Sequence, residues 1–298
     1  MTASDPYRSR GHGWEIIERS DPICWGQRPG PLSSEQLDSF RAQGFLVWPE
    51  LLGADEVEAL RERAAQLRAR PGLRARDDVI TEPDSGAIRS IFRVHRDLHG
   101  DGAIFAQLAA DPRLADVARQ ILASEVYIHQ SRINFKPGFE GREFYWHSDF
   151  ETWHMEDGMA QMRAMSASVL LTDNSSINGP LMLISGSHRR YVRCAGETPA
   201  NHYKQSLVAQ RYGVPDPQAL TSLAEAGEIV EATGPAGTVV FFDSNTMHGS
   251  TGNLSPFPRH NVFLVYNSVE NRLRAPYCGL PPRPEFLAER EAASIARR

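Results

Sequence analysis

The feature that most constrains the fold of this chain is a change of pattern near residue 125. Before it, apolar residues recur at helical spacing, as at Val57, Leu60 and Leu67, and Ser33–Gln36 matches a helix capping box. After it come about eight short stretches rich in β-branched and aromatic residues, separated by turns that contain Gly or Pro. This order predicts a mainly β fold with flanking helices: a double-stranded β-helix (jelly-roll, cupin-like) core with N-terminal helices outside it.

The chain of 298 residues, 41% of them hydrophobic, is long enough to bury a sizeable core. We expect a single domain over 1–298. Its predicted parts are an N-terminal arm (1–32), a mostly helical outer layer (33–124), a jelly-roll core (125–270) with a lid-like insertion near 189–220, and a C-terminal tail (276–298). The charged sequence from about Glu285 predicts a final helix.

A candidate metal site begins at His147-Ser148-Asp149. On a strand, residues i and i+2 point to the same face, so the imidazole and the carboxylate would project together. They form two thirds of the two-histidine, one-carboxylate set that holds Fe(II) and leaves coordination positions open. His248, where a strand runs into a turn, is the best candidate for the third ligand. Further along, Arg259 is a fixed cation suited to binding a carboxylate with two hydrogen bonds.

The predicted strand Glu125–Lys136 carries polar residues on one face. Gln130, Arg132, Asn134 and Lys136 share one parity, so their side chains would point the same way. An inward face this polar would make a poor core, and it is plausible as the lining of a site. A half-solvated strand is the alternative interpretation.

Charge and composition exclude several classes of protein. The net charge is −5 and the sequence pI is about 6.1, without a run of five or more like charges, so nothing suggests a nucleic-acid surface. No apolar run approaches the roughly 18 residues of a membrane span, and the N-terminus lacks the apolar region of a signal peptide. Three widely spaced cysteines fit a reduced, cytoplasmic protein better than a disulfide framework.

The stretch Trp146–Met159 resembles the signature segment of the ectoine hydroxylases, a branch of the phytanoyl-CoA-hydroxylase-like Fe(II)/2-oxoglutarate dioxygenases. Further segments that resemble this branch are Tyr127–Asn134, Asn178–Met182 and Asn201–Ser206. The similarity spans most of the chain and thins at both termini. Ala160 and Ser185 stand where proline is usual, but both are loop positions and leave the expected chemistry untouched.

The resemblance implies hydroxylation of L-ectoine to 5-hydroxyectoine with Fe(II), O2 and 2-oxoglutarate. It implies a cytoplasmic protein as well, and a homodimer is one expected assembly. It also implies roles for individual residues. The matched positions are His147, Asp149 and His248 as catalytic iron ligands; Lys136, Arg259 and Ser250 for 2-oxoglutarate; Gln130 and Trp153 for ectoine; and Phe242, Asn261 and Phe263 as pocket walls. Trp153 would stack on the ectoine ring, whose delocalised cation suits an aromatic face.

Three other functions remain open at this point. The same dioxygenase chemistry could act on another small substrate, such as a proline-like amino acid or an acyl thioester. A non-catalytic jelly-roll binding module would be expected to lose an iron ligand or Arg259, yet all four residues are present. A structural zinc site favours paired cysteines and closed four-fold coordination, and this sequence has no paired cysteines.

Overall fold

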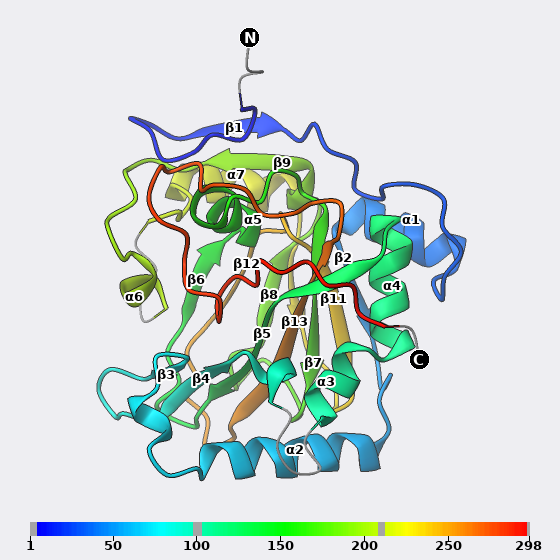
Figure 1. The fold of residues 1–298 in the computed structure, drawn as a ribbon, viewed down its shortest axis with the longest axis vertical. Coiled ribbons are helices and arrows are strands. Elements are labelled where there is room, and N and C mark those ends of the chain that lie inside the picture. The colour runs from blue at the N-terminus through cyan, green and yellow to red at the C-terminus, as the bar shows by residue number, and fades with distance from the viewer. Residues whose placement is uncertain (1–4, 98–102, 208–211, 297–298) are drawn as a thin grey trace.

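The computed structural model describes residues 5–97, 103–207 and 212–296, and it is mainly β with helices on the outside (Figure 1). Within those ranges the α-helices are α1 (Ser34–Gln43), α2 (Ala54–Arg68), α3 (Ile104–Ala109), α4 (Pro112–Leu122), α5 (Asp149–Thr152), α6 (Tyr203–Ser206) and α7 (Pro217–Ala226). Short 3-10 turns are η1 (Leu73–Ala75), η2 (Val94–Arg96) and η4 (Ser187–Arg189), and η3 (Trp153–Asp157) is a π-helix. The expected capping box is confirmed, because Ser33 and Gln36 exchange both of its hydrogen bonds at the start of α1.

The described strands form three antiparallel sheets. A seven-stranded sheet has the order β2 (Phe45–Trp48), β11 (Val239–Asp243), β7 (Ala164–Leu170), β13 (Arg259–Ser268), β5 (Val126–Lys136), β4 (Ile88–Phe92) and β3 (Val79–Thr81). A four-stranded sheet has the order β10 (Ile229–Ala232), β8 (Leu181–Ile184), β12 (His248–Ser250) and β6 (Phe144–His147). A small sheet pairs β1 (Glu15–Glu18) with β9 (Arg190–Arg193).

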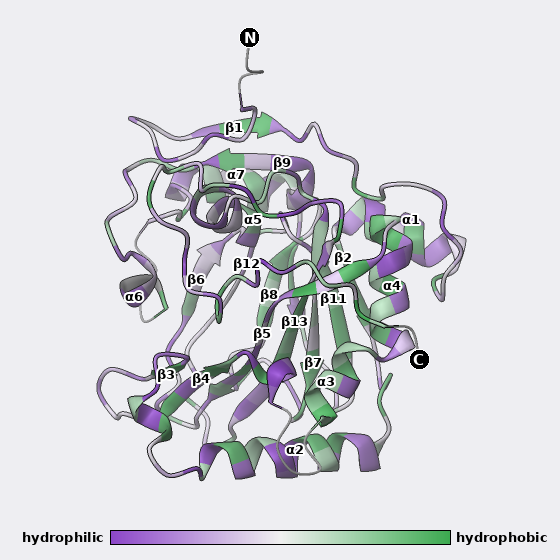
Figure 2. Ribbon diagram, viewed as in Figure 1, coloured by the Kyte–Doolittle hydropathy of each residue, from purple (hydrophilic) through white to green (hydrophobic). Residues whose placement is uncertain are grey.

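The two faces of the seven-stranded sheet pack against different partners. Val262 and Leu264 on β13 belong to a core cluster that includes buried residues of α2 and α4. Phe263, between them, belongs to a second cluster with Leu181 and Leu183 of the four-stranded sheet. Figure 2 shows the apolar residues concentrated on the strands at the centre of the molecule. The alternation along β13 therefore separates a helix-covered face from an inner face between the sheets.

The predicted fold class is confirmed: a mainly β jelly-roll core with flanking helices. Within 33–124, the strands β2, β3 and β4 accompany the helices and extend the large sheet on both sides. One detail differs from expectation. The predicted helix from Glu285 is wrong, since the described tail after α7 and β13 contains no helix.

The tail lacks a helix because its backbone bonds to the large sheet instead. The amide nitrogen of Glu289 donates to the carbonyl oxygen of His129 (2.8 Å), and that of Ile295 donates to Val126 (2.9 Å). Both acceptors lie on β5, so the tail crosses the strand that carries the polar inner face. Among the described residues, no helix is long and apolar enough to cross a membrane.

Candidate metal centre and its pocket

His147 and His248 lie opposite each other on paired strands. His147 is the last residue of β6, His248 is the first of β12, and the two are partners in the antiparallel register. The sequence predicted Asp149 on the same strand as His147, but Asp149 is instead the first residue of α5. Ser148 between them is extended (φ −101°, ψ 128°), and this single extended residue keeps the carboxylate on the same side as the imidazole of His147.

The three side chains form a cluster that fits one metal ion. Their candidate ligand atoms all lie within 4.8 Å of one another. Nε2 of His147 is 3.6 Å from Oδ1 of Asp149, and Nε2 of His248 is 3.8 Å from Oδ2. Two atoms that each bind one ion at about 2.1 Å lie no more than about 4.2 Å apart, so both separations are already compatible with a shared ion.

The hydrogen bonds around the cluster leave Nε2 of each histidine available to bind a metal ion. Nδ1 of His147 bonds to the carbonyl oxygen of Tyr145 (2.7 Å), and Nδ1 of His248 bonds to that of Thr246 (2.9 Å). A carbonyl can only accept, so each Nδ1 carries the proton and each Nε2 presents a lone pair to the cluster.

Electrostatics favour the protonation states that a metal requires. Burial, reinforced by the neighbouring His147, lowers the pKa of His248 to about 4, so its imidazole is neutral near pH 7. For Asp149, burial raises the pKa, but the two histidines and Arg132 outweigh burial and lower it to about 2. Near pH 7 the cluster therefore offers the neutral imidazole of His248 and the ionised carboxylate of Asp149 beside His147. Two histidines and one carboxylate are the combination that suits Fe(II).

Two of the three candidate ligands, His147 and Asp149, line a pocket. Gln130 and Arg132 of β5 form part of its wall, together with Trp153 of η3, Leu207 and Arg283 of the tail. Trp153 is 3% exposed and also packs edge-on against His129, so it is both a pocket wall and part of the core. Nε2 of Gln130 donates to the carbonyl oxygen of Leu287 (2.7 Å), which uses one of its amide hydrogens on the tail.

A second cluster, which we term the cradle, consists of Lys136, Arg259 and Ser250. Lys136 and Arg259 are register partners on β5 and β13, and they are 1% and 2% exposed. Nζ of Lys136 donates to Oγ of Ser250 (2.7 Å) and to the carbonyl oxygen of Thr251. Two glycines close over the lysine: a Cβ at Gly141 would lie 2.3 Å from its Cγ, and a Cβ at Gly179 would lie 3.0 Å from its Cδ.

The cradle holds buried positive charge that no acid in the described ranges neutralises by a salt bridge. Nε and Nη1 of Arg259 have no hydrogen-bond partner among the described residues. Burial, then the charges of Arg259 and Arg89, lowers the pKa of Lys136 to about 5. Burial, then Arg132 and Arg89, lowers the pKa of Arg259 to about 9. Because uncompensated buried charge is costly, the cradle is suited to an anionic ligand.

The three residues expected as pocket walls lie on the inner face of the large sheet. Phe242 and Phe263 belong to the apolar cluster between the sheets, and the ring of Phe242 lies 5.0 Å from that of His248. Asn261 is fully buried beside Ser168 (3.4 Å), and its Oδ1 has no partner in the described ranges. All three lie between the sheets, although they are not among the residues that line the pocket.

Two cations of the pocket were not among the predicted site residues. Arg132 shares the parity of Gln130, and that pattern was the signal that could have identified it; its guanidinium lies 5.0 Å from the ring centre of Phe263. Arg283 had no local signal, because only the course of the tail brings it there. Asp157 binds it with two hydrogen bonds of 2.8 and 2.6 Å.

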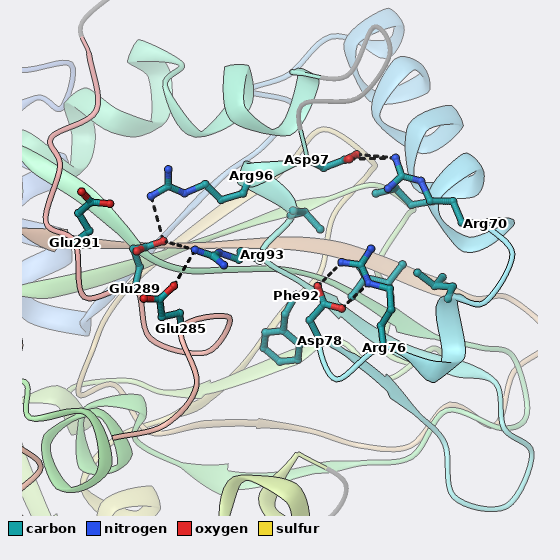
Figure 3. A pocket seen from close by; sticks show the side chains of 14 residues that line it. Arg70, Arg76, Asp78, Phe92, Arg93, Arg96, Asp97, Glu285, Glu289 and Glu291 are labelled. Atoms are coloured by element: carbon teal, nitrogen blue, oxygen red, sulfur yellow. Dashed lines mark hydrogen bonds and ion pairs between the residues drawn. The ribbon is translucent and has the colours of Figure 1, made fainter. Parts of the chain in front are cut away.

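A second cavity, of about 410 Å³, lies next to the pocket (Figure 3). Phe92 lines both of them. Figure 3 shows the arginines of the second cavity paired with acids: Arg76 binds Asp78 (2.6 Å), and Arg93 and Arg96 both bind Glu289 (3.3 and 3.1 Å). The charges lining this cavity thus largely balance one another, unlike those of the cradle.

Known proteins resemble this chain along almost its whole length. A model of the family described as phytanoyl-CoA dioxygenase (PhyH) matches residues 40–261. The chain is 56% identical to the ectoine dioxygenase of Bordetella bronchiseptica, with 99% of this chain and 96% of that one covered. The crystal structure of EctD from S. alaskensis with 2-oxoglutarate and 5-hydroxyectoine is 49% identical, with a TM-score of 0.88 and 99% and 98% of the chains covered. The structure of the same protein with bound Fe has a TM-score of 0.86, with the same identity and coverage.

Proposed function

Because the chain belongs to the phytanoyl-CoA dioxygenase family, we propose that it hydroxylates L-ectoine to 5-hydroxyectoine, using Fe(II), O2 and 2-oxoglutarate and releasing succinate and CO2. One observation carries the proposal: a buried arginine without a salt-bridge partner among the described residues, with a buried lysine beside it, lies in the same inter-sheet space as a two-histidine, one-carboxylate cluster. A metal alone would explain the cluster, but the cradle requires an anion as well, and 2-oxoglutarate is an anionic cosubstrate.

In this proposal, Nε2 of His147, Nε2 of His248 and the carboxylate of Asp149 hold the iron and are the catalytic residues. Bound Fe(II) would couple the oxidative decarboxylation of 2-oxoglutarate by O2 to hydroxylation of the substrate. The backbone carbonyls of Tyr145 and Thr246 keep both imidazoles in the tautomer that presents Nε2.

The cradle would bind 2-oxoglutarate through its distal carboxylate. Arg259 supplies unpaired N–H donors, Lys136 a second cation, and Ser250 a hydroxyl already oriented by the lysine. An arriving carboxylate raises the pKa of Lys136, because it favours the charged ammonium that burial disfavours. Binding the cosubstrate therefore resolves the charge imbalance of the ligand-free site.

Ectoine is a small zwitterion, a cyclic amidinium beside a carboxylate, and the pocket offers a complementary group for each part. The face of Trp153 suits the delocalised cation and would contribute roughly 0.5–2 kcal/mol. Gln130 supplies an amide for hydrogen bonding, and Arg132 supplies a positive charge for the carboxylate. Phe242, Asn261 and Phe263 would limit the volume on the inner face.

We also propose that residues 1–298 form one domain in which the segment near 189–220 acts as a lid; residues 208–211 of this segment lie outside the described residues. Leu207 of this segment lines the pocket, and its strand β9 pairs with β1 of the N-terminal arm. We further propose a cytoplasmic protein that forms a homodimer. Cys24, Cys194 and Cys278 are all unpaired, which fits a reducing compartment. Light scattering of the purified protein would measure the oligomeric state.

The function is tested with the purified protein, loaded anaerobically with Fe(II) and then given O2, 2-oxoglutarate and a panel of compatible solutes and proline-like amino acids. Among the compounds of the panel, only ectoine should be converted, and NMR should detect 5-hydroxyectoine and an equal amount of succinate. Preferential turnover of another compound would replace the substrate assignment and leave the dioxygenase class intact. The variant His248→Ala should fold, lose iron and lose both products; an iron-replete, active variant would refute the ligand assignment.

A further inference from the structure

Ser148 lies between the candidate ligands His147 and Asp149, but its side chain points away from the cluster toward the loop that precedes His248. Its Oγ donates to Oδ1 of Asn245 (2.9 Å), and both side chains are buried, at 4% and 1% exposure. We infer that Ser148 and Asn245 are positioning residues: their hydrogen bond fixes Asp149 relative to His248 and thereby sets the affinity for the metal. The inference rests on the proposed function, because it concerns the iron site proposed there.

Asp149 is held from both sides by this loop. On one side, Ser148 bonds to Asn245. On the other side, the amide nitrogen of Phe150 donates to the carbonyl oxygen of Ser244 (2.9 Å). Residues 244 and 245 lead directly into His248. A change in the distance between the carboxylate and the imidazole of His248 would therefore strain both hydrogen bonds.

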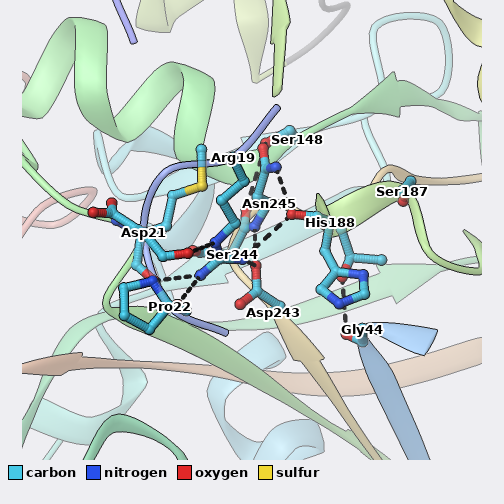
Figure 4. A network of polar contacts seen from close by, with 12 residues as sticks. Arg19, Asp21, Pro22, Gly44, Ser148, Ser187, His188, Asp243, Ser244 and Asn245 are labelled. Carbon is cyan, nitrogen blue, oxygen red and sulfur yellow. Dashed lines mark hydrogen bonds and ion pairs between the residues drawn. The ribbon is translucent and has the colours of Figure 1, made fainter. Parts of the chain in front are cut away.

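Asn245 is itself anchored on all of its polar side-chain atoms (Figure 4). Nδ2 donates to the carbonyl oxygens of His188 (3.0 Å) and Arg190 (2.9 Å), while Oδ1 accepts from Ser148. The amide nitrogen of Asn245 donates to Oδ1 of Asp243 (2.8 Å). The asparagine is thus a rigid reference point against which Ser148, and with it Asp149, is set.

The N-terminal arm completes this anchor. Nη1 of Arg19 bonds to Oδ1 of Asp243 (2.8 Å), and the two side chains are 2% and 3% exposed. Figure 4 shows Arg19, Asp243 and Asn245 joined in one network with Ser148. The arm therefore reaches the metal-binding segment through three hydrogen bonds without contacting the metal ligands themselves. Removing a residue that hydrogen-bonds to a metal ligand commonly weakens metal binding by about 10–100-fold.

The test measures Fe(II) binding to metal-free protein by anaerobic calorimetry. Ser148→Ala is expected to weaken Fe(II) binding by about 10-fold or more. Ser148→Thr keeps the hydroxyl and should bind nearly as tightly as wild type. Asn245→Ala should weaken binding as well, and the double variant Ser148→Ala/Asn245→Ala should lose less than the sum of the two, because both changes remove the same bond.

Ser124→Ala is a matched control. Ser124 is also buried (3% exposed). Its hydroxyl donates to the carbonyl oxygen of Glu125 (2.8 Å) and accepts from Ser268 (2.8 Å). Ser268 is the last residue of β13, whereas Arg259 of the cradle is the first, so this control lies far from the cradle along the strand. Both Ser→Ala variants should lower the melting temperature similarly, but only Ser148→Ala should lose Fe(II) affinity.

The outcomes separate the inference from the proposed function. If wild type binds one Fe(II) and makes 5-hydroxyectoine while Ser148→Ala binds Fe(II) as tightly, the inference is wrong and the function stands. Equal losses in Ser148→Ala and Ser124→Ala would also overturn it, since the effect would then be general destabilisation. Absence of Fe(II) binding by wild type would overturn the function and the inference together.

Discussion

Two groups of buried basic side chains, one in the N-terminal arm and one in the cradle, differ in how their charge is balanced. Arg10 in the N-terminal arm binds Glu151 (2.9 Å) and Glu156 (2.6 Å), so its charge is neutralised within the protein. In the cradle, by contrast, Lys136 and Arg259 face no salt-bridged acid among the described residues. The first group completes the folded chain, whereas the second is completed only by a ligand.

The pKa shifts report the same difference. For Arg10, burial lowers the pKa, but the two glutamates outweigh burial and raise it above its usual value. For Arg259, burial and neighbouring cations act in the same direction and lower the pKa to about 9. The lowered pKa of Arg259, together with its N–H donors that lack a partner in the described ranges, therefore distinguishes it from Arg10 as a candidate binding residue.

The largest effect on stability is expected for Arg10→Met. The substitution leaves Glu151 and Glu156 buried without their cation, which typically costs about 3–5 kcal/mol. Thermal and urea unfolding of the metal-free protein should show the loss. The matched substitution Arg259→Met removes an unpaired charge and should leave stability unchanged or increased. Equal destabilisation by both variants would mean that the two groups of cations do not differ.

Arg259→Met should instead weaken binding of 2-oxoglutarate. Loss of a charged donor from a buried pair typically costs about 2–5 kcal/mol, or roughly 30-fold to several thousand-fold in affinity. The KM for 2-oxoglutarate should rise by this factor, while Fe(II) binding persists. An unchanged KM would contradict the assignment of Arg259 to the cosubstrate.

Lys136 predicts a pH dependence of stability. Its pKa is about 5 in the ligand-free fold and about 10.5 in the unfolded chain, so between these values the unfolded chain binds a proton that the native protein lacks. Stability of the ligand-free protein should therefore rise with pH across this window, by at most about 1.4 kcal/mol per pH unit.

The variant Lys136→Met should lose that slope. Binding of 2-oxoglutarate near pH 7.5 should be accompanied by uptake of up to about one proton in wild type and of less in the variant. Calorimetry in buffers of different ionisation enthalpy measures this uptake. Identical uptake by both proteins would place the titrating group elsewhere.

The smallest effect is expected for Trp153→Phe. The cation concerned is the amidinium of the substrate, which the proposal balances with an aromatic face rather than with an acid. Phenylalanine keeps that face, so ectoine affinity should fall by less than about 1 kcal/mol. Trp153→Ala should lose more and should convert 2-oxoglutarate to succinate without an equal yield of 5-hydroxyectoine. Wild-type affinity in Trp153→Ala would make Trp153 a core residue only.

Sequence patterns were most reliable where the chemistry is local. The alternation along β5 identified a polar inner face, and the structure has Lys136 and Asn134 opposite Arg259 and Asn261 in the register of β13. The helices α1 and α2 followed from a capping box and from apolar spacing. These features depend on neighbours within a few residues, so the linear sequence contains the information needed.

The sequence by itself determined the kinds of candidate site residue and their order along the chain: two histidines, one carboxylate and a downstream arginine. Only the tertiary structure decided how they meet. Asp149 begins a helix and is fixed by residues 244 and 245, and Arg283 reaches the pocket because the tail bonds to β5 rather than forming a helix. The physical reason is that each of these placements depends on hydrogen bonds between segments about a hundred residues or more apart, and no local propensity specifies such partners.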